Sequence, residues 1–355
     1  MSRRLRRRYH DASSGPVGFD RRQRPRPEGS SVLDRRELLL GVPLALLAAH
    51  ANAQPAPKVI GVLSPYAGAD VQATLAVFRQ AMRDLGYGEG RSFTLVERFA
   101  DGRYDRLASL AAELVKLRVD LILASTTNAV KAAQAATSTI PIVFESVADP
   151  VLAGFADSVN RPGHNITGLS NFSIDLSPKR FQLLTQLLPA LRDVEVLSNP
   201  SNPYYATQKP AVESVANKLG LRANFVDVST AEEVEQAFRA MAARRATALM
   251  VTADAYLLAQ RRTIATLALS HRLPSVFPFA AYVEAGGLMS YGVDPAPAMR
   301  QAALLVDKIF KGAHPGDLPI EQPTRVEMVI NRRTAALLRL TIPPAMLVQA
   351  ERVID

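Results

Sequence analysis

The residues of this sequence that could do chemistry favour binding over catalysis. The 355 residues include no cysteine, so disulfides, thiolate nucleophiles and cysteine-ligated metals are excluded. Past residue 53 the only histidines are His164, His271 and His314, which are too far apart for a helical metal motif. A serine–histidine–aspartate triad stays open, because its members can be distant in sequence, but nothing favours one. We therefore expect a protein that is not an enzyme and has no cofactor or metal.

The remaining candidates are polar and aromatic side chains that directly follow short apolar runs. Thr126 and Thr127 open a helix, whose free N–H groups and positive dipole end suit an anion such as a carboxylate. Glu145 and Asp149 follow another apolar run and could pair with a ligand ammonium group. Taken singly, each polar residue could instead cap a helix or form a turn, and Phe279 could pack in a core. The candidate ligand-binding residues are Ser64, Tyr66, Ser125, Thr126, Thr127, Glu145, Asp149, Asn171, Asn199, Asp254, Phe279 and Tyr291.

The apolar runs belong to an alternation of strands and helices that occurs twice. Residues 58–63, 93–96, 119–124 and 140–144 have the length and β-branched content of buried parallel strands. Helical spacing lies between them. The order restarts after Pro189, with strands predicted at 194–197, 221–226, 248–251 and 273–277. This order predicts an α/β fold of two Rossmann-like lobes, each with a parallel sheet covered on both faces.

A third segment, residues 286–353, fits neither lobe alone. It contains a predicted helix (298–310), a strand (325–330) and a terminal helix (332–338), so the chain must cross between the lobes again. We expect residues 57–170 with 287–325 to form an N-terminal lobe, and 171–286 with 326–355 a C-terminal lobe. A multi-crossover hinge of this kind leaves a cleft where the C-terminal strand ends of both sheets face each other.

The first 53 residues have the composition of an export signal. They carry most of the formal net charge of +9, so the rest of the chain gives no indication of nucleic-acid binding. Arg35 and Arg36 precede an apolar run, residues 38–49, that ends in Ala51-Asn52-Ala53. That pattern predicts a signal peptide over residues 32–53, by the Sec or the twin-arginine route. The run is too short to span a bilayer, so we expect a periplasmic protein that does not itself span the membrane after processing. Residues 1–31 are predicted to be a disordered arginine-rich extension or to precede the true start.

Several motifs resemble the ABC-transporter substrate-binding family, whose better-known members take up tryptophan or phenylalanine. The resemblance covers about residues 57–355. Its motifs are Asp149-Pro150-Val151 with Ala153-Gly154, residues 161–168 (RPGHNITG), 283–292 (VEAGGLMSYG), 309–312 (IFKG), 317–323 (DLPIEQP) and 342–344 (IPP).

This resemblance implies a type I periplasmic-binding fold, in which two lobes close on a ligand by hinge motion. Carried over by position, Thr126 and Thr127 match the helix-start motif, Asp149 the acidic loop and Asn171 the polar crossover residue. Two departures are Ser125-Thr126-Thr127-Asn128, where members often have Gly/Ala-Thr-Pro-Ala, and the neutral Asn171, which weakens recognition of an ammonium group.

The expected function is that of an extracytoplasmic receptor. It would capture an amino-acid-like or aromatic or polar organic solute between its lobes and deliver it to an inner-membrane ABC permease. The alternative is a ligand-binding sensor accessory without a transport role. We expect a monomer with a small-molecule ligand.

Overall fold

The computed structural model describes residues 56–355, apart from residues 148, 152, 171–175 and 323–324. The predicted signal peptide, the arginine-rich extension and the candidate site residue Asn171 lie outside the described residues. Residues 55–355 form one compact unit. In the described part of this unit, no helix combines the length and the apolar character needed to cross a membrane.

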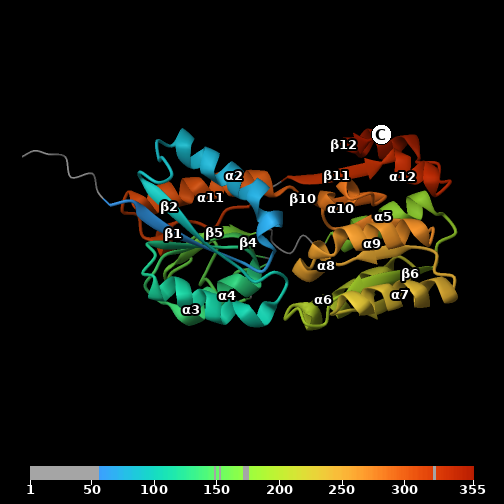
Figure 1. The fold of residues 1–355 in the computed structure, drawn as a ribbon, viewed down its shortest axis with the longest axis horizontal. Coiled ribbons are helices and arrows are strands. Elements are labelled where there is room, and N and C mark those ends of the chain that lie inside the picture. Colours follow the sequence, from blue (N-terminus) through green and yellow to red (C-terminus); the bar gives the residue numbers. More distant parts are fainter. Residues whose placement is uncertain (1–55, 148, 152, 171–175, 323–324) are drawn as a thin grey trace, which may run out of the picture. The chain divides into compact units, whose positions relative to one another are not determined.

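The first lobe is built on a five-stranded parallel sheet with the strand order β2-β1-β3-β4-β5. Its helices cover both faces, and α11 returns from late in the chain to pack beside α2 (Figure 1). The elements are β1 (Lys58–Ser64), α2 (Gly68–Asp84), β2 (Phe93–Phe99), η1 (Tyr104–Arg106), α3 (Leu107–Lys116), β3 (Leu121–Ala124), α4 (Thr126–Ala136), β4 (Ile142–Val147), β5 (Ile166–Ser170), α11 (Pro295–Phe310) and η2 (Pro315–Asp317).

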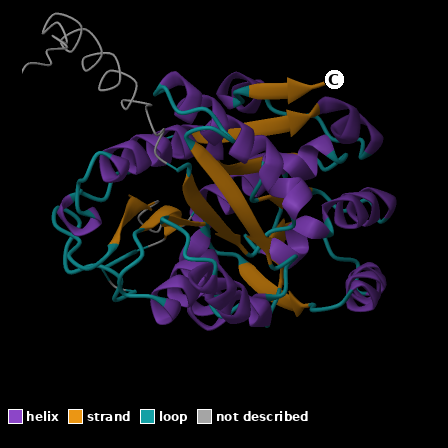
Figure 2. Ribbon diagram, turned by 60° about the vertical axis from the view of Figure 1, so that its left-hand side comes forward, coloured by secondary structure: helices purple, strands orange, loops and turns teal. Residues whose placement is uncertain are grey.

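The second lobe is built on a seven-stranded sheet with the order β12-β11-β10-β9-β8-β6-β7, in which only the β10–β11 pair is antiparallel. Helices again lie on both sides of the strands (Figure 2). The elements are α5 (Ser177–Leu187), β6 (Asp193–Ser198), α6 (Tyr205–Lys218), β7 (Arg222–Asp227), α7 (Ala231–Ala243), β8 (Leu249–Val251), α8 (Ala255–Ala259), α9 (Arg261–Ser270), β9 (Ser275–Phe277), α10 (Ala280–Glu284), β10 (Met289–Val293), β11 (Val326–Asn331), α12 (Arg332–Leu337), α13 (Pro344–Gln349) and β12 (Arg352–Ile354).

The strand pattern of the first lobe explains its two cores. Successive side chains of a strand point to opposite faces, so Leu121 and Leu123 of β3 pack with α2 and α11. Ile122 and Ala124 of the same strand pack with α3 and α4 on the other face. All four side chains are fully buried, which accounts for the continuous apolar run that predicted a strand covered on both faces.

The predicted α/β fold with two lobes and parallel sheets is confirmed, with local differences. The helical segment between the predicted strands 248–251 and 273–277 consists of two helices, α8 and α9, which meet at Gln260. Residues 287–325 were expected to return to the first lobe, but strand β10 does not. Its residues Met289–Val293 bond β9 on one edge and β11 on the other. These residues therefore belong to the second sheet. The chain passes between the lobes three times, after β5, after β10 and after η2.

Candidate functional site

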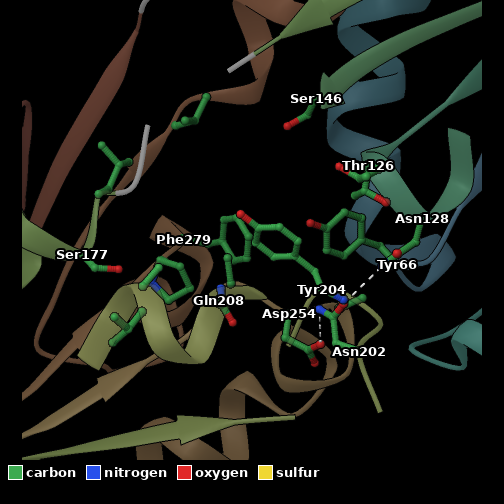
Figure 3. A pocket seen from close by; sticks show the side chains of 18 of the residues that line it. Tyr66, Thr126, Asn128, Ser146, Ser177, Asn202, Tyr204, Gln208, Asp254 and Phe279 are labelled. Carbon is green, nitrogen blue, oxygen red and sulfur yellow. Dashed lines mark hydrogen bonds between the residues drawn. The ribbon is translucent and has the colours of Figure 1, made fainter. Parts of the chain in front are cut away.

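A cavity of about 410 Å³ lies between the two lobes, at the C-terminal ends of their strands. Tyr66 follows β1, Thr126 follows β3 and Ser146 lies near the end of β4 in the first lobe. Asn202 follows β6 and Phe279 follows β9 in the second lobe. Figure 3 shows these side chains around one space. Open α/β sheets bind ligands at this end of their strands, and the volume is that of a small-molecule site.

The first-lobe wall is the start of helix α4. Thr126 has a φ of 77°, a left-handed conformation that is strained for a β-branched residue. Its hydroxyl oxygen is buried and has no hydrogen-bond partner among the described residues. Thr127 and Asn128 line the cavity beside it. The helix N-terminus therefore presents free N–H groups and a hydroxyl that could bind an anion.

Aromatic rings form much of the remaining wall. Tyr66 from the first lobe meets Phe279 from the second edge to face, with 6.3 Å between ring centroids. Tyr204 extends into the same space (Figure 3). Burial raises the pKa of the Tyr66 hydroxyl, as do the nearby carboxyl groups of Glu145 and Asp254. This hydroxyl is therefore neutral at physiological pH and can donate a hydrogen bond.

Among the described residues that line the cavity, one is basic, and this is Arg180 of helix α5. Its side chain is buried, and its Nε donates to the backbone oxygen of Tyr291 at 2.9 Å. That bond fixes the plane of the guanidinium group. A buried guanidinium of fixed orientation suits a carboxylate.

Asp254 is the acidic residue of the same lining, and protein donors surround it. Its two oxygens accept from the hydroxyl of Tyr104 at 2.9 Å, from the side-chain amides of Asn199 and Asn202, and from the backbone N–H of Leu257. Two of these bonds are charge-assisted side-chain contacts below 3.1 Å. Asp254 is thus a structural acceptor rather than a group open to a ligand ammonium.

The structure divides the sequence-predicted site residues into three groups. Tyr66, Thr126, Thr127, Asp254 and Phe279 line the cavity. Behind them, Ser64 accepts from the Tyr66 backbone N–H, Ser125 bonds Glu145, and Asn199 bonds Asp254.

Asp149 and Tyr291 are not among the residues that line the cavity. Asp149 Oδ1 accepts from the backbone N–H of Val151 at 3.1 Å, so this carboxylate stabilises its own turn. Tyr291 is in strand β10 and packs against the second-lobe core. Asn171 lies outside the described residues.

Sequence reasoning missed several lining residues, among them Tyr104, Arg180, Tyr204 and Gln208. Arg180 follows no strand and lies on a helix that was not predicted. Its side chain reaches the cavity because α5 packs against the strands β9 and β10. The run of Phe181, Leu183, Leu184 and Leu187, all buried, was the available signal for that helix.

Glu145 is a buried carboxyl group directly behind the cavity wall. Burial raises its pKa from the usual 4.5 to about 7, although the hydrogen bond from Ser125 opposes the shift. Between these two pH values the folded protein holds a proton that the unfolded chain has lost. The contribution of Glu145 to the free energy of unfolding therefore falls as pH rises from about 4.5 to 7. Above pH 7 it is constant.

Glu145→Gln is expected to remove this dependence. The variant should gain about 3 kcal/mol over the parent at pH 8 and little at pH 4.5, which follows from about 1.4 kcal/mol for each unit of pKa difference. Urea denaturation of both proteins between pH 4.5 and 8 measures the difference. A parent–variant difference that does not change with pH would show that Glu145 has an ordinary pKa.

Comparisons with known proteins agree with this geometry. The chain matches the family described as ABC transporter substrate binding protein over residues 59–354. A protein of Clostridioides difficile named tyrosine-binding protein is 28% identical over 262 residues, which cover 74% of this chain and 75% of the relative.

Two solved structures are similar in fold. A conserved domain protein from Vibrio cholerae has a TM-score of 0.76 and 26% identity, covering 83% of this chain and 99% of the other. A protein from Streptococcus pneumoniae, described as an ABC domain in complex with L-Trp, has a TM-score of 0.75 and 24% identity, covering 84% of this chain and all of the other. The fold is that of type I periplasmic-binding proteins.

Proposed function

The chain belongs to the family of ABC transporter substrate binding proteins, and on this premise we propose that it captures a small aromatic carboxylate between its lobes. The observation that carries the proposal is the composition of the cavity wall. Aromatic rings from both lobes lie beside a helix N-terminus and a buried arginine. The buried threonine hydroxyl at that helix N-terminus has no hydrogen-bond partner among the described residues.

The two kinds of wall have separate roles. The ligand carboxylate would bind the N–H groups and hydroxyls of Thr126 and Thr127, with Arg180 as the neutralising charge. The aromatic part of the ligand would lie against Tyr66, Tyr204 and Phe279, since offset and edge-to-face ring pairs are favourable. The tyrosine-binding relative from Clostridioides difficile supports this class of ligand.

Delivery to an inner-membrane ABC permease is the second part of the proposal. Membership of the family supports it, and the signal-peptide pattern of residues 32–53 supports export to the periplasm. The receptor would release its ligand when the permease separates the lobes.

Ligand capture is tested by thermal unfolding of the purified protein with a panel of compounds. The panel holds L-tyrosine, L-phenylalanine, L-tryptophan, 4-hydroxyphenylacetate and benzoate, with D-ribose as the control. At 100 times its Kd, a true ligand should stabilise the protein by about 2.7 kcal/mol. Native mass spectrometry of the protein as purified looks for a bound molecule of the same class. Stabilisation by D-ribose alone, or by no aromatic carboxylate, would contradict the proposal.

A further inference from the structure

Helix α6 of the second lobe turns one face toward the cavity. Tyr204, the N-cap residue, and Gln208, Ala211 and Val212 of the helix all line the space. Their i, i+4, i+7 and i+8 spacing is that of a single helix face. The backbone N–H of Gln208 donates to the backbone oxygen of Tyr204 at 3.0 Å, so the first turn fixes the backbone from which the Gln208 side chain extends.

Gln208 brings to this face a polar group that the fold does not use. Its side chain is half-buried, and its amide has no hydrogen-bond partner among the described residues. The other side-chain amides of the lining are engaged within the protein, since Asn128 donates to Asn202 at 3.1 Å and Asn202 donates to Asp254 at 3.0 Å. A ligand that covers Gln208 must therefore supply the hydrogen bond that water otherwise makes, or leave the amide unsatisfied.

Gln208 also lies away from the helix start that the proposed function assigns to the ligand carboxylate. Figure 3 shows Thr126 on one side of the rings of Tyr204 and Phe279, and Gln208 on the other. A ligand with its carboxylate at α4 and its ring against these side chains reaches Gln208 with the remote part of the ring. The group that meets Gln208 is therefore a ring substituent.

A carboxamide favours a particular kind of substituent. It has two N–H donors and a carbonyl acceptor but no charge, so it offers no counter-charge to an ion. A hydroxyl group suits it, because a hydroxyl can either accept from Nε2 or donate to Oε1. An unsubstituted phenyl ring can do neither and leaves the amide unpaired, which is the basis on which polar sites reject ligands that lack a hydroxyl.

We propose that Gln208 is a specificity-determining residue that selects ligands with a hydroxyl group on the aromatic ring. The solute is then a hydroxyaryl carboxylate, a narrower class than the aromatic carboxylates of the proposed function. The inference rests on that function, because the carboxylate and the ring must bind as described above for the ring hydroxyl to reach Gln208.

Two pairs of ligands that differ by one ring hydroxyl test this inference. They are L-tyrosine with L-phenylalanine, and 4-hydroxyphenylacetate with phenylacetate. Calorimetric titration of the parent should give a Kd about tenfold lower for the hydroxylated member of each pair, the effect of one hydrogen bond. Gln208→Leu removes the amide, so the two members of each pair should bind this variant with the same Kd. Since the Gln208 side chain bonds no described residue, the variant should unfold at the temperature of the parent.

Gln182→Leu is the matched control. Gln182 is exposed on α5 and does not line the cavity, so the same substitution there should keep the tenfold ratio of the parent. Equal affinity of the parent for both members of each pair would overturn the inference and leave the proposed function intact, and so would a ratio that persists in Gln208→Leu. Failure of all these compounds to bind the parent would overturn the proposed function, and the inference with it.

Discussion

Asp254→Ala is expected to lower the free energy of unfolding by about 3 kcal/mol or more. The carboxylate accepts from Tyr104, Asn199, Asn202 and the backbone of Leu257, and its residue is 3% exposed. Truncation leaves several buried donors without an acceptor, at about 1–3 kcal/mol for each group that water cannot reach. Urea denaturation gives the change from the shift of the midpoint at constant slope.

Asp149→Ala provides the comparison for that measurement. Asp149 accepts from the backbone N–H of Val151 within a turn, so its loss should cost about 1 kcal/mol. The same variant should keep the parent's ligand affinity, because Asp149 does not line the cavity. If Asp254→Ala were no more destabilising than Asp149→Ala, the interpretation of Asp254 as a buried structural acceptor would be wrong.

Arg180→Gln is expected to weaken binding of an aromatic carboxylate about 100-fold. The substitution removes the basic group of the described cavity lining and leaves the ligand anion without its counter-charge in a partly desolvated site, which costs about 2–5 kcal/mol. Calorimetric titration of parent and variant with L-tyrosine measures the change in Kd.

L-Tyrosine amide serves as the ligand-side control for this prediction. It keeps the ring and the ammonium group but has no carboxylate, so the parent should discriminate strongly between acid and amide, and Arg180→Gln should not. A variant that discriminates as well as the parent would place the carboxylate away from Arg180.

The fold was predictable where a segment carries its own pattern. Residues 119–124 were predicted as a buried strand and contain β3, since two covered faces require a continuous apolar run. Strand β10 was not predicted, because Met289–Val293 becomes a strand through pairing with β9 and β11. Only the tertiary fold brings β9 and β11 beside β10.

The site residues that directly follow a strand were predictable from the sequence. Tyr66, Thr126 and Phe279 follow strands, and parallel sheets gather such residues at one edge. Tyr104 and Arg180 could not be found in this way, because each reaches the cavity from a helical segment between other elements. Asp254 follows a strand as expected, but its use as an acceptor depends on donors more than 50 residues away in sequence.

Hydrogen exchange followed by mass spectrometry tests the central claim, that one ligand is bound by both lobes. Helix α4, residues 126–136, belongs to the first lobe, and α6 with its preceding loop, residues 202–218, belongs to the second. We expect saturating L-tyrosine to slow amide exchange in both segments together, while α13 in the second lobe, away from the cavity lining, keeps its rate. Slower exchange in only one of the two segments would contradict a binding site between the lobes.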